Sequence, residues 1–359
     1  MTERVRIGIV GCGAVAQIQH LPNLTFLRDE FDVIAVCDLS ATLARGAAEE
    51  YVVDNWHTDL DAFLGEPLQA VLLCQSDPKV DVAMRVLESG RHLFIEKPVA
   101  FVPGDVDRMA AAAQAVNLVA QAGYMKVYDP AFRLVEREVE GMRSHLRFVQ
   151  VNHLHTDNRH HLTHFRLRGA DDLPASARDD LGARRRADAQ RALGVASEDV
   201  RSAFFHLAGS MIHDLYGLRH LFGPPDRVAS TEIWNGGLGI TTVLSWDGGP
   251  RCAATWVELE RIRHFRETLE VYGANRGVIL SYPTGFSRGI LSEVTVRGVD
   301  DDGQPFEQRP GIDWESPFVT ELRHFHACIT EDETCRTPLA EARHDVQLVV
   351  DIALAAPSI

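Results

Sequence analysis

Over the first third of the chain, short hydrophobic runs alternate with segments that have a helical pattern of hydrophobic and polar positions. Short apolar runs rich in β-branched residues recur at residues 6–10, 33–37, 71–74 and 92–95. Helical patterns lie between them, for example at 80–88 and 106–116. Strands that alternate with helices predict a parallel sheet built from βαβ units.

The rest of the chain has a different pattern. Strand-like segments follow one another with short turns and without intervening helices, at 148–155, 227–234, 240–246, 251–259, 268–272, 277–282 and 293–299. Consecutive strands of this kind predict an antiparallel sheet. We therefore predict two domains, at residues 1–125 and 126–359. A last helix at about 338–356 is expected to pack back toward the first domain.

Residues 166–201 fit neither pattern, because they are rich in Ala, Arg and Asp and contain three consecutive arginines at 184–186. One interpretation is one or two solvated helices with interspersed charge. The other is a lid or oligomer arm that places arginines on a phosphate-bearing ligand.

Composition and net charge exclude several classes of binding partner. The hydrophobic fraction of 45% is that of a globular protein, and 36 basic against 51 acidic residues give a net charge of −15. Such an acidic chain repels nucleic-acid backbones and anionic membrane surfaces, so neither partner is expected. The six cysteines form no CxxC pair, and no export signal is recognised, which indicates reduced thiols in a cytoplasmic protein.

A glycine-rich turn follows the first apolar run, in the order Gly11, Cys12, Gly13, Ala14, Val15 and Ala16. The first glycine of such a GxGxxA motif permits a tight turn, the second lets the backbone approach a pyrophosphate, and the small last residue lets the helix pack on the strand. The helix that begins here directs its amide groups and positive end at the phosphates. The motif predicts dinucleotide binding; a glycine turn that only joins strand to helix is the alternative.

An acidic residue supports this prediction. Asp38 ends the second apolar run at about the expected distance of ~20 residues from the motif, where it would bond the ribose hydroxyls and repel a 2′-phosphate. Leu39 follows it, where a basic residue would suit NADP. The expected cofactor is therefore NAD, with NADP possible.

Further candidates lie where later strands end, since ligands collect at the carboxyl ends of parallel strands. The cofactor is expected to be lined there by Cys74, Gln75, Glu96, Lys97 and Pro98. A lysine at this edge can hydrogen-bond a reacting hydroxyl, stabilise developing alkoxide and relay its proton. Lys97 is therefore a candidate catalytic and substrate-binding residue, although a Glu-Lys-Pro sequence alone is more often a surface turn.

Together these stretches resemble the Gfo/Idh/MocA family (glucose–fructose oxidoreductase, inositol dehydrogenase and rhizopine catabolism). The similarity covers residues 6–16, 70–73, 87–98 and 123–130, and returns at 212–214 and 337–342. It implies a Rossmann domain with a doubly wound parallel sheet, followed by an α+β domain with a large open, mostly antiparallel sheet. It also implies NAD(P)-dependent oxidation or reduction of a sugar or cyclitol hydroxyl.

The resemblance also carries roles onto single residues. The family's Glu-Lys-Pro lysine matches Lys97, and its active-site histidine matches His213. The family's aspartate four residues before that histidine is replaced by Gly209, which removes one expected substrate-holding partner. Asp214, at the next position, points about 100° away around a helix, whereas Tyr216 lies on the face of His213.

Four other side chains are candidates for the substrate site. Lys126 and Tyr128 follow the stretch that should leave the Rossmann domain over the nicotinamide; a hinge with a packed aromatic ring is the alternative. His153 and His155 face the same side of a strand, where they would line the substrate pocket. No carboxylate or cysteine with firm ligand spacing completes a metal site with them, so no metal is predicted.

We therefore expect an enzyme that transfers a hydride between nicotinamide and a secondary hydroxyl or ketone of a sugar, cyclitol or derivative. Lys97 would polarise the oxygen, and His213 would act as general acid/base. One alternative is a regulator that senses a dinucleotide or sugar without chemistry, which Gly209 favours. Another is an enzyme that uses bound NAD transiently for elimination, epimerisation or glycoside cleavage. The expected partners are a small molecule and further copies of the chain, in a homo-dimer or homo-tetramer formed through the open sheet.

Overall fold

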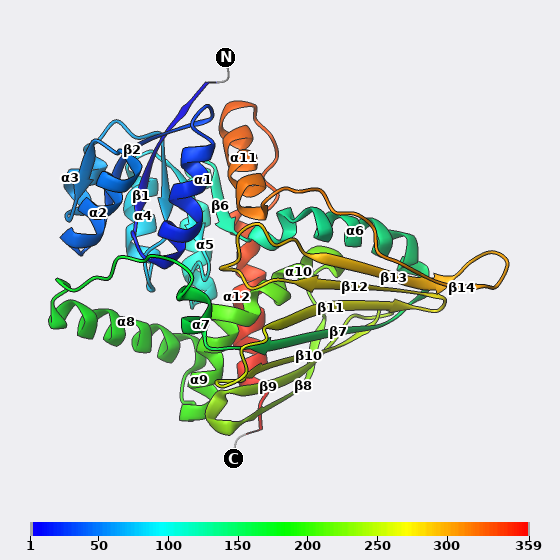
Figure 1. Cartoon of the computed structure of the whole chain (residues 1–359). Coiled ribbons are helices and arrows are strands. Elements are labelled where there is room, and N and C mark those ends of the chain that lie inside the picture. The colour runs from blue at the N-terminus through cyan, green and yellow to red at the C-terminus, as the bar shows by residue number, and fades with distance from the viewer. Residues whose placement is uncertain (1–2, 358–359) are drawn as a thin grey trace. The chain divides into compact units, whose positions relative to one another are not determined.

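The apolar runs of the first third form a six-stranded parallel sheet in the computed structural model, which describes residues 3–357 (Figure 1). The strand order β3-β2-β1-β4-β5-β6 is that of a doubly wound Rossmann fold. The strands are β1 (Val5–Val10), β2 (Phe31–Cys37), β3 (Asn55–His57), β4 (Ala70–Leu73), β5 (His92–Glu96) and β6 (Ala120–Gly123). The four predicted strands are present. The sequence did not indicate β3 and β6, which have three and four residues and no branched apolar run.

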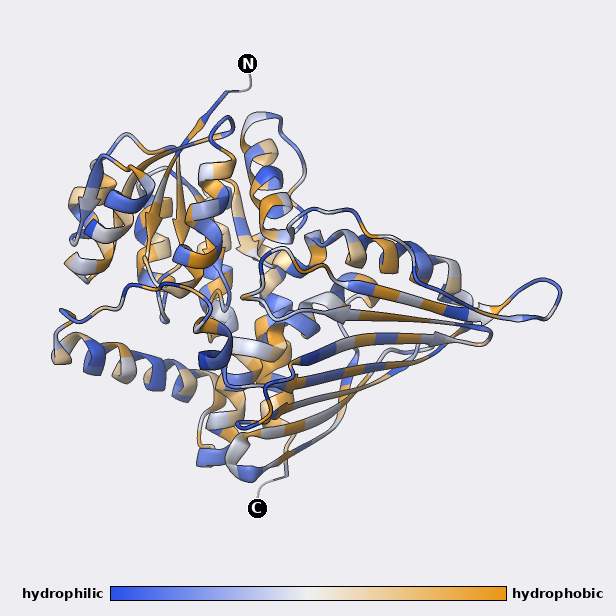
Figure 2. Ribbon diagram, in the orientation of Figure 1, coloured by the Kyte–Doolittle hydropathy of each residue, from blue (hydrophilic) through white to orange (hydrophobic). Residues whose placement is uncertain are grey.

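Burial explains why the central strands read as unbroken apolar runs. Every residue of β4 is buried, as are five of the six residues of β1, and these strands are mainly orange in Figure 2. A parallel sheet is covered on both faces, so its strands do not alternate between apolar and polar residues. The helices of this part are α1 (Leu21–Phe26), α2 (Ala41–Tyr51), α3 (Leu60–Leu64), α4 (Val80–Glu88) and α5 (Pro103–Ala115), with a π-helical turn η1 (Ala16–His20) before α1.

The chain divides into two compact units. Unit 1 consists of residues 3–124, 165–192 and 318–346, and unit 2 of residues 125–164, 193–317 and 347–357. The predicted domain boundary at residues 125 and 126 stays a prediction. The two later segments of unit 1 contain α8 (Ala175–Leu193, up to residue 192), α11 (Pro317–Thr330) and the first part of α12 (Leu339–Leu354).

Unit 2 is built on an eight-stranded sheet in the order β14-β13-β12-β11-β7-β10-β9-β8. All neighbouring strands are antiparallel except β7 and β10, which are parallel. The prediction of a Rossmann sheet followed by a mostly antiparallel sheet is confirmed. The strands are β7 (Leu146–His155), β8 (Arg227–Trp234), β9 (Gly239–Ser245), β10 (Arg251–Glu258), β11 (Arg266–Gly273), β12 (Arg276–Tyr282), β13 (Glu293–Val299) and β14 (Pro305–Gln308), the last of which was not predicted.

The two faces of this sheet differ in polarity. Val149 and Val151 of β7 point to a buried face, while Asn152, on the other face, is aligned with polar residues of the neighbouring strands. That polar row consists of Thr241, Thr255, Asn152, Thr268 and Ser281. The helical elements of unit 2 are η2 (Met125–Tyr128), α6 (Pro130–Met142), η3 (Arg143–His145), α7 (Asn158–Leu162), α9 (Glu198–His206), the π-helical turn η4 (Leu207–Met211), α10 (Ile212–Phe222) and η5 (Asn235–Gly237).

The arginine-rich segment forms the helices α8 and α9. Arg191 of α8 bonds the Asp105 carboxylate with both guanidinium nitrogens, at 2.9 and 3.0 Å, and Arg184 pairs with Asp81. Asp105 and Asp81 belong to α5 and α4 of the same unit. These two arginines therefore bind carboxylates within unit 1, in agreement with the interpretation of a charged helix on the surface.

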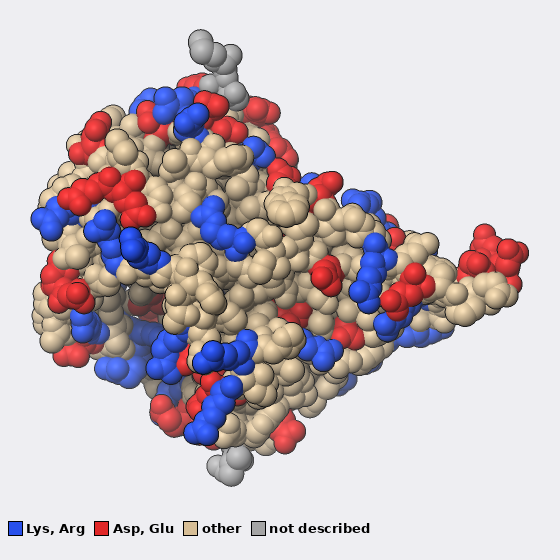
Figure 3. Space-filling view, viewed as in Figure 1, with Lys and Arg blue, Asp and Glu red and all other residues tan. Residues whose placement is uncertain are grey.

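The surface carries charges of both signs, as the composition indicates (Figure 3). Acidic and basic side chains are interspersed over the face shown in Figure 3. No helix within residues 3–357 is long and apolar enough to cross a bilayer. All six cysteines are free thiols.

Glu321 of α11 is a carboxyl group fully buried in unit 1. Burial and then the charge of Glu96 raise its pKa well above the ordinary value, against a smaller opposing effect of the Tyr124 N–H. Because the folded-state pKa is raised, the stability that this group contributes is present below its unfolded pKa and is lost as the pH rises through the folded value.

Glu321→Gln is therefore expected to raise the free energy of unfolding by about 1–3 kcal/mol at pH 8 and to change it little at pH 4. Urea denaturation at both pH values measures the difference. The control is Glu333→Gln, which alters a carboxylate with a 54% exposed side chain shortly after the same helix. An equal effect of Glu321→Gln at both pH values would contradict the assignment.

Candidate active site

The turn after β1 has the backbone geometry that the nucleotide motif requires. Gly11 has a φ of +92°, and a Cβ there would lie 2.2 Å from the Gln75 backbone nitrogen. A Cβ on Gly13 would meet nothing within 4 Å, so the space over this residue is open. The Oε1 atom of Gln75 is buried and has no hydrogen-bond partner among the described residues. An open cradle and an unsatisfied polar atom fit a bound dinucleotide.

Asp38 lies beside this turn at the end of β2. Its Oδ2 accepts a hydrogen bond from the Cys12 N–H at 2.8 Å, and its Oδ1 accepts one from the Ser40 N–H at 2.9 Å. Each carboxylate oxygen has a second lone pair, so Asp38 can also accept bonds from ribose hydroxyls. Leu39 is 60% exposed.

The end of β5 carries a buried contact between a glutamate and a histidine. Glu96 Oε1 lies 2.7 Å from His20 Nε2, and Glu96 Oε2 accepts a hydrogen bond from the Lys97 N–H at 3.1 Å. Burial would raise the pKa of Glu96, but His20, Lys97 and Lys79 together hold it below its usual value. Glu96 is thus a carboxylate that fixes the backbone on which Lys97 stands, and Lys97 itself is half-buried.

A second lysine, Lys79, lies in the same unit as Lys97. It is buried at the N-terminus of α4, where its Nζ donates to the Pro98 carbonyl at 3.1 Å and pairs with Asp77. Lys79 therefore positions the segment that follows Lys97. Cys74, at the end of β4, is half-buried, and burial raises the pKa of its thiol.

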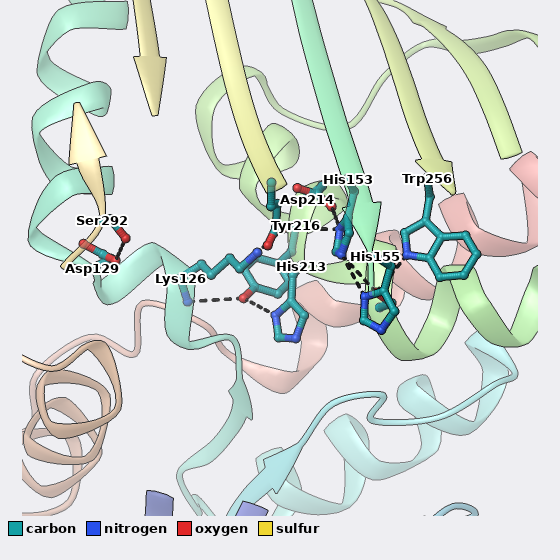
Figure 4. A network of polar contacts seen from close by, with 11 residues as sticks. Lys126, Asp129, His153, His155, His213, Asp214, Tyr216, Trp256 and Ser292 are labelled. Carbon is teal, nitrogen blue, oxygen red and sulfur yellow. Dashed lines mark hydrogen bonds and ion pairs between the residues drawn. The ribbon is translucent and has the colours of Figure 1, made fainter. Parts of the chain in front are cut away.

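In unit 2, His213 lies on α10 and is bonded to a tyrosine one turn along the helix. His213 Nδ1 is 2.8 Å from Tyr216 Oη, which also accepts a hydrogen bond from the Lys126 N–H at 3.2 Å (Figure 4). A phenolic oxygen has two lone pairs, so Tyr216 Oη can accept bonds from both the Lys126 N–H and the His213 Nδ1–H. With Nδ1–H held in this way, an imidazolium carries its second proton on Nε2, and this is the proton that a general acid would donate.

A second network connects four buried ionisable residues of unit 2. His153 Nδ1 lies 2.8 Å from Asp214 Oδ2 and 3.4 Å from Glu267 Oε1, and Lys126 Nζ pairs with Glu267. Burial raises the pKa of Asp214, but the charges of His153 and Lys126 bring it below its usual value. Burial and the charge of Asp214 raise the pKa of Glu267. Asp214 is therefore the carboxylate that this network keeps ionised.

The second ring nitrogen of His153, Nε2, also has a hydrogen-bonding neighbour. Trp256 Nε1–H donates to Ser210 Oγ at 2.9 Å, and Ser210 Oγ lies 3.2 Å from His153 Nε2. Trp256 also stacks with His155 at a centroid distance of 5.6 Å and with His206 at 4.5 Å. His153 is buried and His155 half-buried, so the two predicted pocket histidines differ in access.

Two groups of three among the described residues could hold a metal ion, and their ligand atoms lie within 4.8 Å of one another. They are His153 with Asp214 and Glu267, and His324 with Cys328 and Cys335. In the first group the Lys126 ammonium already supplies a cation to Glu267. The sequence did not indicate either group, because each joins residues from different elements. The expectation of no metal stays a prediction.

Removing the Lys126 ammonium group from the buried network should lower the stability of the fold. Lys126→Met leaves two buried carboxyl groups with one fewer partner, so we expect a loss of about 3–5 kcal/mol in unfolding free energy. Urea denaturation at pH 7 measures it. The double variant Lys126→Met with Glu267→Gln should recover part of the loss, since it removes the unpaired charge as well. Equal losses in the single and double variants would mean that the ion pair does not stabilise the fold.

The first comparison with known proteins concerns unit 1. Residues 5–124 match the Gfo/Idh/MocA family model, described as "Oxidoreductase family, NAD-binding Rossmann fold". The resemblance inferred from the motifs is thereby confirmed, and the nucleotide turn of unit 1 is that of an NAD(P)-binding fold.

Curated relatives match over somewhat more than a third of the chain. Inositol 2-dehydrogenase of Ralstonia nicotianae is 29% identical over 140 residues, which is 38% of this chain and 41% of the relative. Myo-inositol 2-dehydrogenase of Thermotoga maritima is 27% identical over 138 residues, again 38% and 41%. The matches thus span about two fifths of the length of these relatives.

Solved structures match the whole chain in fold. UDP-N-acetylglucosamine 3-dehydrogenase from Acidithiobacillus ferrooxidans has a TM-score of 0.74 at 17% identity, covering 99% of this chain and 98% of that one. A 3-ketoreductase from Actinomadura kijaniata, solved with NADP and TDP-benzene, has a TM-score of 0.73 at 15% identity, with the same coverage. At these identities the likeness concerns the fold of both units.

The structure brings together two separate groups of the predicted residues. Gly11 to Ala16, Asp38 and Gln75 meet around the turn of unit 1, whereas Lys126, His153, His155 and His213 take part in the polar contacts of unit 2. Tyr128 is fully buried. The sequence carries no signal for Ser210, Trp256 or Glu267, because their contacts join distant segments.

One signal in the sequence could have singled out Lys79 and supports the choice of Lys97 and Lys126. The chain has 36 basic residues, yet only Lys79, Lys97 and Lys126 are lysines. Arginine serves at every other basic position, so lysine remains where a compact point charge has a use. All three lysines are part of the contacts described above.

Proposed function

We propose that this protein is an NAD(P)-dependent oxidoreductase that acts on a secondary hydroxyl or ketone of a sugar, cyclitol or derivative. The observation that carries the proposal is the NAD-binding Rossmann unit with Lys97 at the end of β5, beside Glu96. The names of the relatives support the substrate class, since two of them are inositol dehydrogenases. When bound, the cofactor would accept or supply the hydride.

In this proposal Lys97 polarises the substrate oxygen and His213 is a general acid/base. Lys97 would hydrogen-bond that oxygen and stabilise the charge that develops as the hydride moves. As an imidazolium, His213 would donate its Nε2 proton in reduction, which leaves a neutral ring whose Nδ1–H is held by Tyr216 Oη; that ring would receive a proton at Nε2 in oxidation. Glu96 and Tyr216 act through these two residues, because each is bonded to one of them or to its backbone.

The experiment is a spectrophotometric screen. The purified protein is mixed with NAD⁺ and a panel of polyols, or with NADH and a panel of keto-sugars, and absorbance is followed at 340 nm. Substrate-dependent absorbance change that the cofactor alone does not produce is the expected result. No change with any member of either panel would count against a sugar or cyclitol dehydrogenase.

Gly209 favours a second candidate function, a dinucleotide- or sugar-sensing regulator. It lies in the π-helical turn η4 before His213, and a Cβ there would meet nothing within 4 Å. Such a regulator would bind NADH and sugar without turnover. An enzyme that uses NAD transiently would instead form product without net NADH, which mass spectrometry of the reaction mixture detects.

We also propose that the polar face of the unit 2 sheet joins copies of the chain in a homo-dimer or homo-tetramer. A sheet face whose row of Thr, Asn and Ser side chains crosses five strands offers an extensive flat surface. Light scattering of the purified protein tests this, and a monomer would refute it.

The expected location stays the cytoplasm, where free thiols are stable.

A further inference from the structure

The turn between β2 and α2 receives a carboxylate from a distant part of unit 1. Asp172 precedes α8, yet its Oδ2 accepts a hydrogen bond from the Thr42 N–H at 3.0 Å, and the Ser40 hydroxyl donates to its Oδ1. Ser40 is the N-cap of α2, and its Oγ accepts a bond from the Leu43 N–H at 3.1 Å. Asp172 therefore lies at the positive end of α2.

The segment that carries Asp172 is anchored to unit 1 at several points. The Gln17 side chain accepts a bond from the Arg168 N–H at 2.9 Å and donates to the Arg168 carbonyl at 3.3 Å. Ala170 packs against the hydrophobic core of the unit, and Arg168 lies 3.7 Å from the Glu50 carboxylate. Asp172 thus has a defined position beside the nucleotide turn.

The hydrogen-bond donors of this corner are used within the chain. The N–H groups of Cys12 and Ser40 donate to Asp38, and the Ser40 hydroxyl and the Thr42 N–H donate to Asp172. A helix N-terminus at the end of the second strand would otherwise suit a phosphate group. The Ser40 and Thr42 bonds lower the pKa of Asp172, so its carboxylate is ionised at neutral pH.

We propose that Asp172 is a specificity-determining residue, which acts with Asp38 to select NAD over NADP. Its carboxylate occupies the end of α2 at which the 2′-phosphate of NADP would seek donors, and its charge repels that phosphate. The inference rests on the dinucleotide cofactor of the proposed function. It does not depend on which substrate is oxidised or on whether Lys97 is catalytic.

The test is equilibrium binding of NADH and NADPH, followed by nicotinamide fluorescence, with no substrate present. Asp172→Asn keeps the shape of the side chain and removes its charge. We expect its affinity for NADPH to rise about tenfold, while its affinity for NADH changes less than about threefold. The same gain should appear when Asp172→Asn is added to Asp38→Asn. The matched control is Asp171→Asn, which removes the same charge from the neighbouring residue.

Three outcomes would overturn the proposal. The first is an NADPH affinity of Asp172→Asn within twofold of wild type in both backgrounds, which would assign the selection to Asp38 alone. The second is an equal gain in Asp171→Asn, which would indicate a general charge effect. The third is a matching loss of NADH binding and thermal stability, which would make Asp172 a merely structural support. A protein that selects NADH as expected but oxidises no polyol would refute the proposed dehydrogenase activity and leave this inference standing.

Discussion

Lys97→Ala should lower kcat on a substrate found in the screen by about 10²–10⁴-fold, the range over which a positioned acid or base contributes. The reason is electrostatic. Lys97 is the cation at the end of β5, and Glu96 holds its backbone. Without the ammonium group, charge that develops on the reacting oxygen has lost a preorganised partner. Steady-state kinetics with saturating cofactor measure the effect.

The binding of NADH separates this role from a structural one. Lys97→Ala should keep its NADH affinity within about threefold, because the turn at Gly11 and Asp38 is unchanged. Arg108→Ala is the control, since it removes a half-exposed cation from α5 in the same unit. Turnover by Lys97→Ala that matches that of the control would exclude the catalytic assignment. Loss of NADH binding together with kcat would assign Lys97 to cofactor binding instead.

Gly11→Ala should disrupt both the fold of unit 1 and cofactor binding. The new Cβ would lie 2.2 Å from the Gln75 backbone nitrogen, and the φ of +92° disfavours any side chain. The backbone at Gln75 has little freedom to move, because the preceding Cys74 N–H is bonded to the Val10 carbonyl at 2.7 Å. We expect a loss of about 2–4 kcal/mol in unfolding free energy and a fall of at least tenfold in NADH affinity.

The neighbouring glycine provides a matched comparison. Gly13→Ala adds the same methyl group where nothing lies within 4 Å, so the protein without ligand should keep its stability. Its NADH affinity should still fall, because the methyl group projects into the space where the backbone is expected to approach the pyrophosphate. Urea denaturation and fluorescence titration distinguish the two variants. Equal stability losses in both, or unchanged NADH binding by Gly13→Ala, would show that the turn does not hold the dinucleotide as described.

The fold could be predicted from local patterns to a large extent. Parallel strands such as β4 consist of consecutive buried residues, and β7 alternates between buried and half-exposed ones, so each sheet has a recognisable sequence pattern. The short strands β3 and β14 have neither signal, because pairing with a neighbour defines them. The assignment of residues 165–192 and 318–346 to unit 1 could not be predicted, since it depends on contacts such as that of Arg191 with Asp105.

The residues of the candidate site fall into two groups: those that the sequence indicates, and those that only the tertiary structure brings together. The positions of the nucleotide turn, of Asp38 and of Lys97 after the ends of strands could be predicted from the sequence, because they depend on local order along the chain. The tertiary structure was needed for the pairing of Asp214 with His153, of Lys126 with Glu267 and of Asp172 with Ser40. In each pair the partners come from segments well separated in the sequence, and only folding brings their charges and hydrogen-bonding atoms within reach.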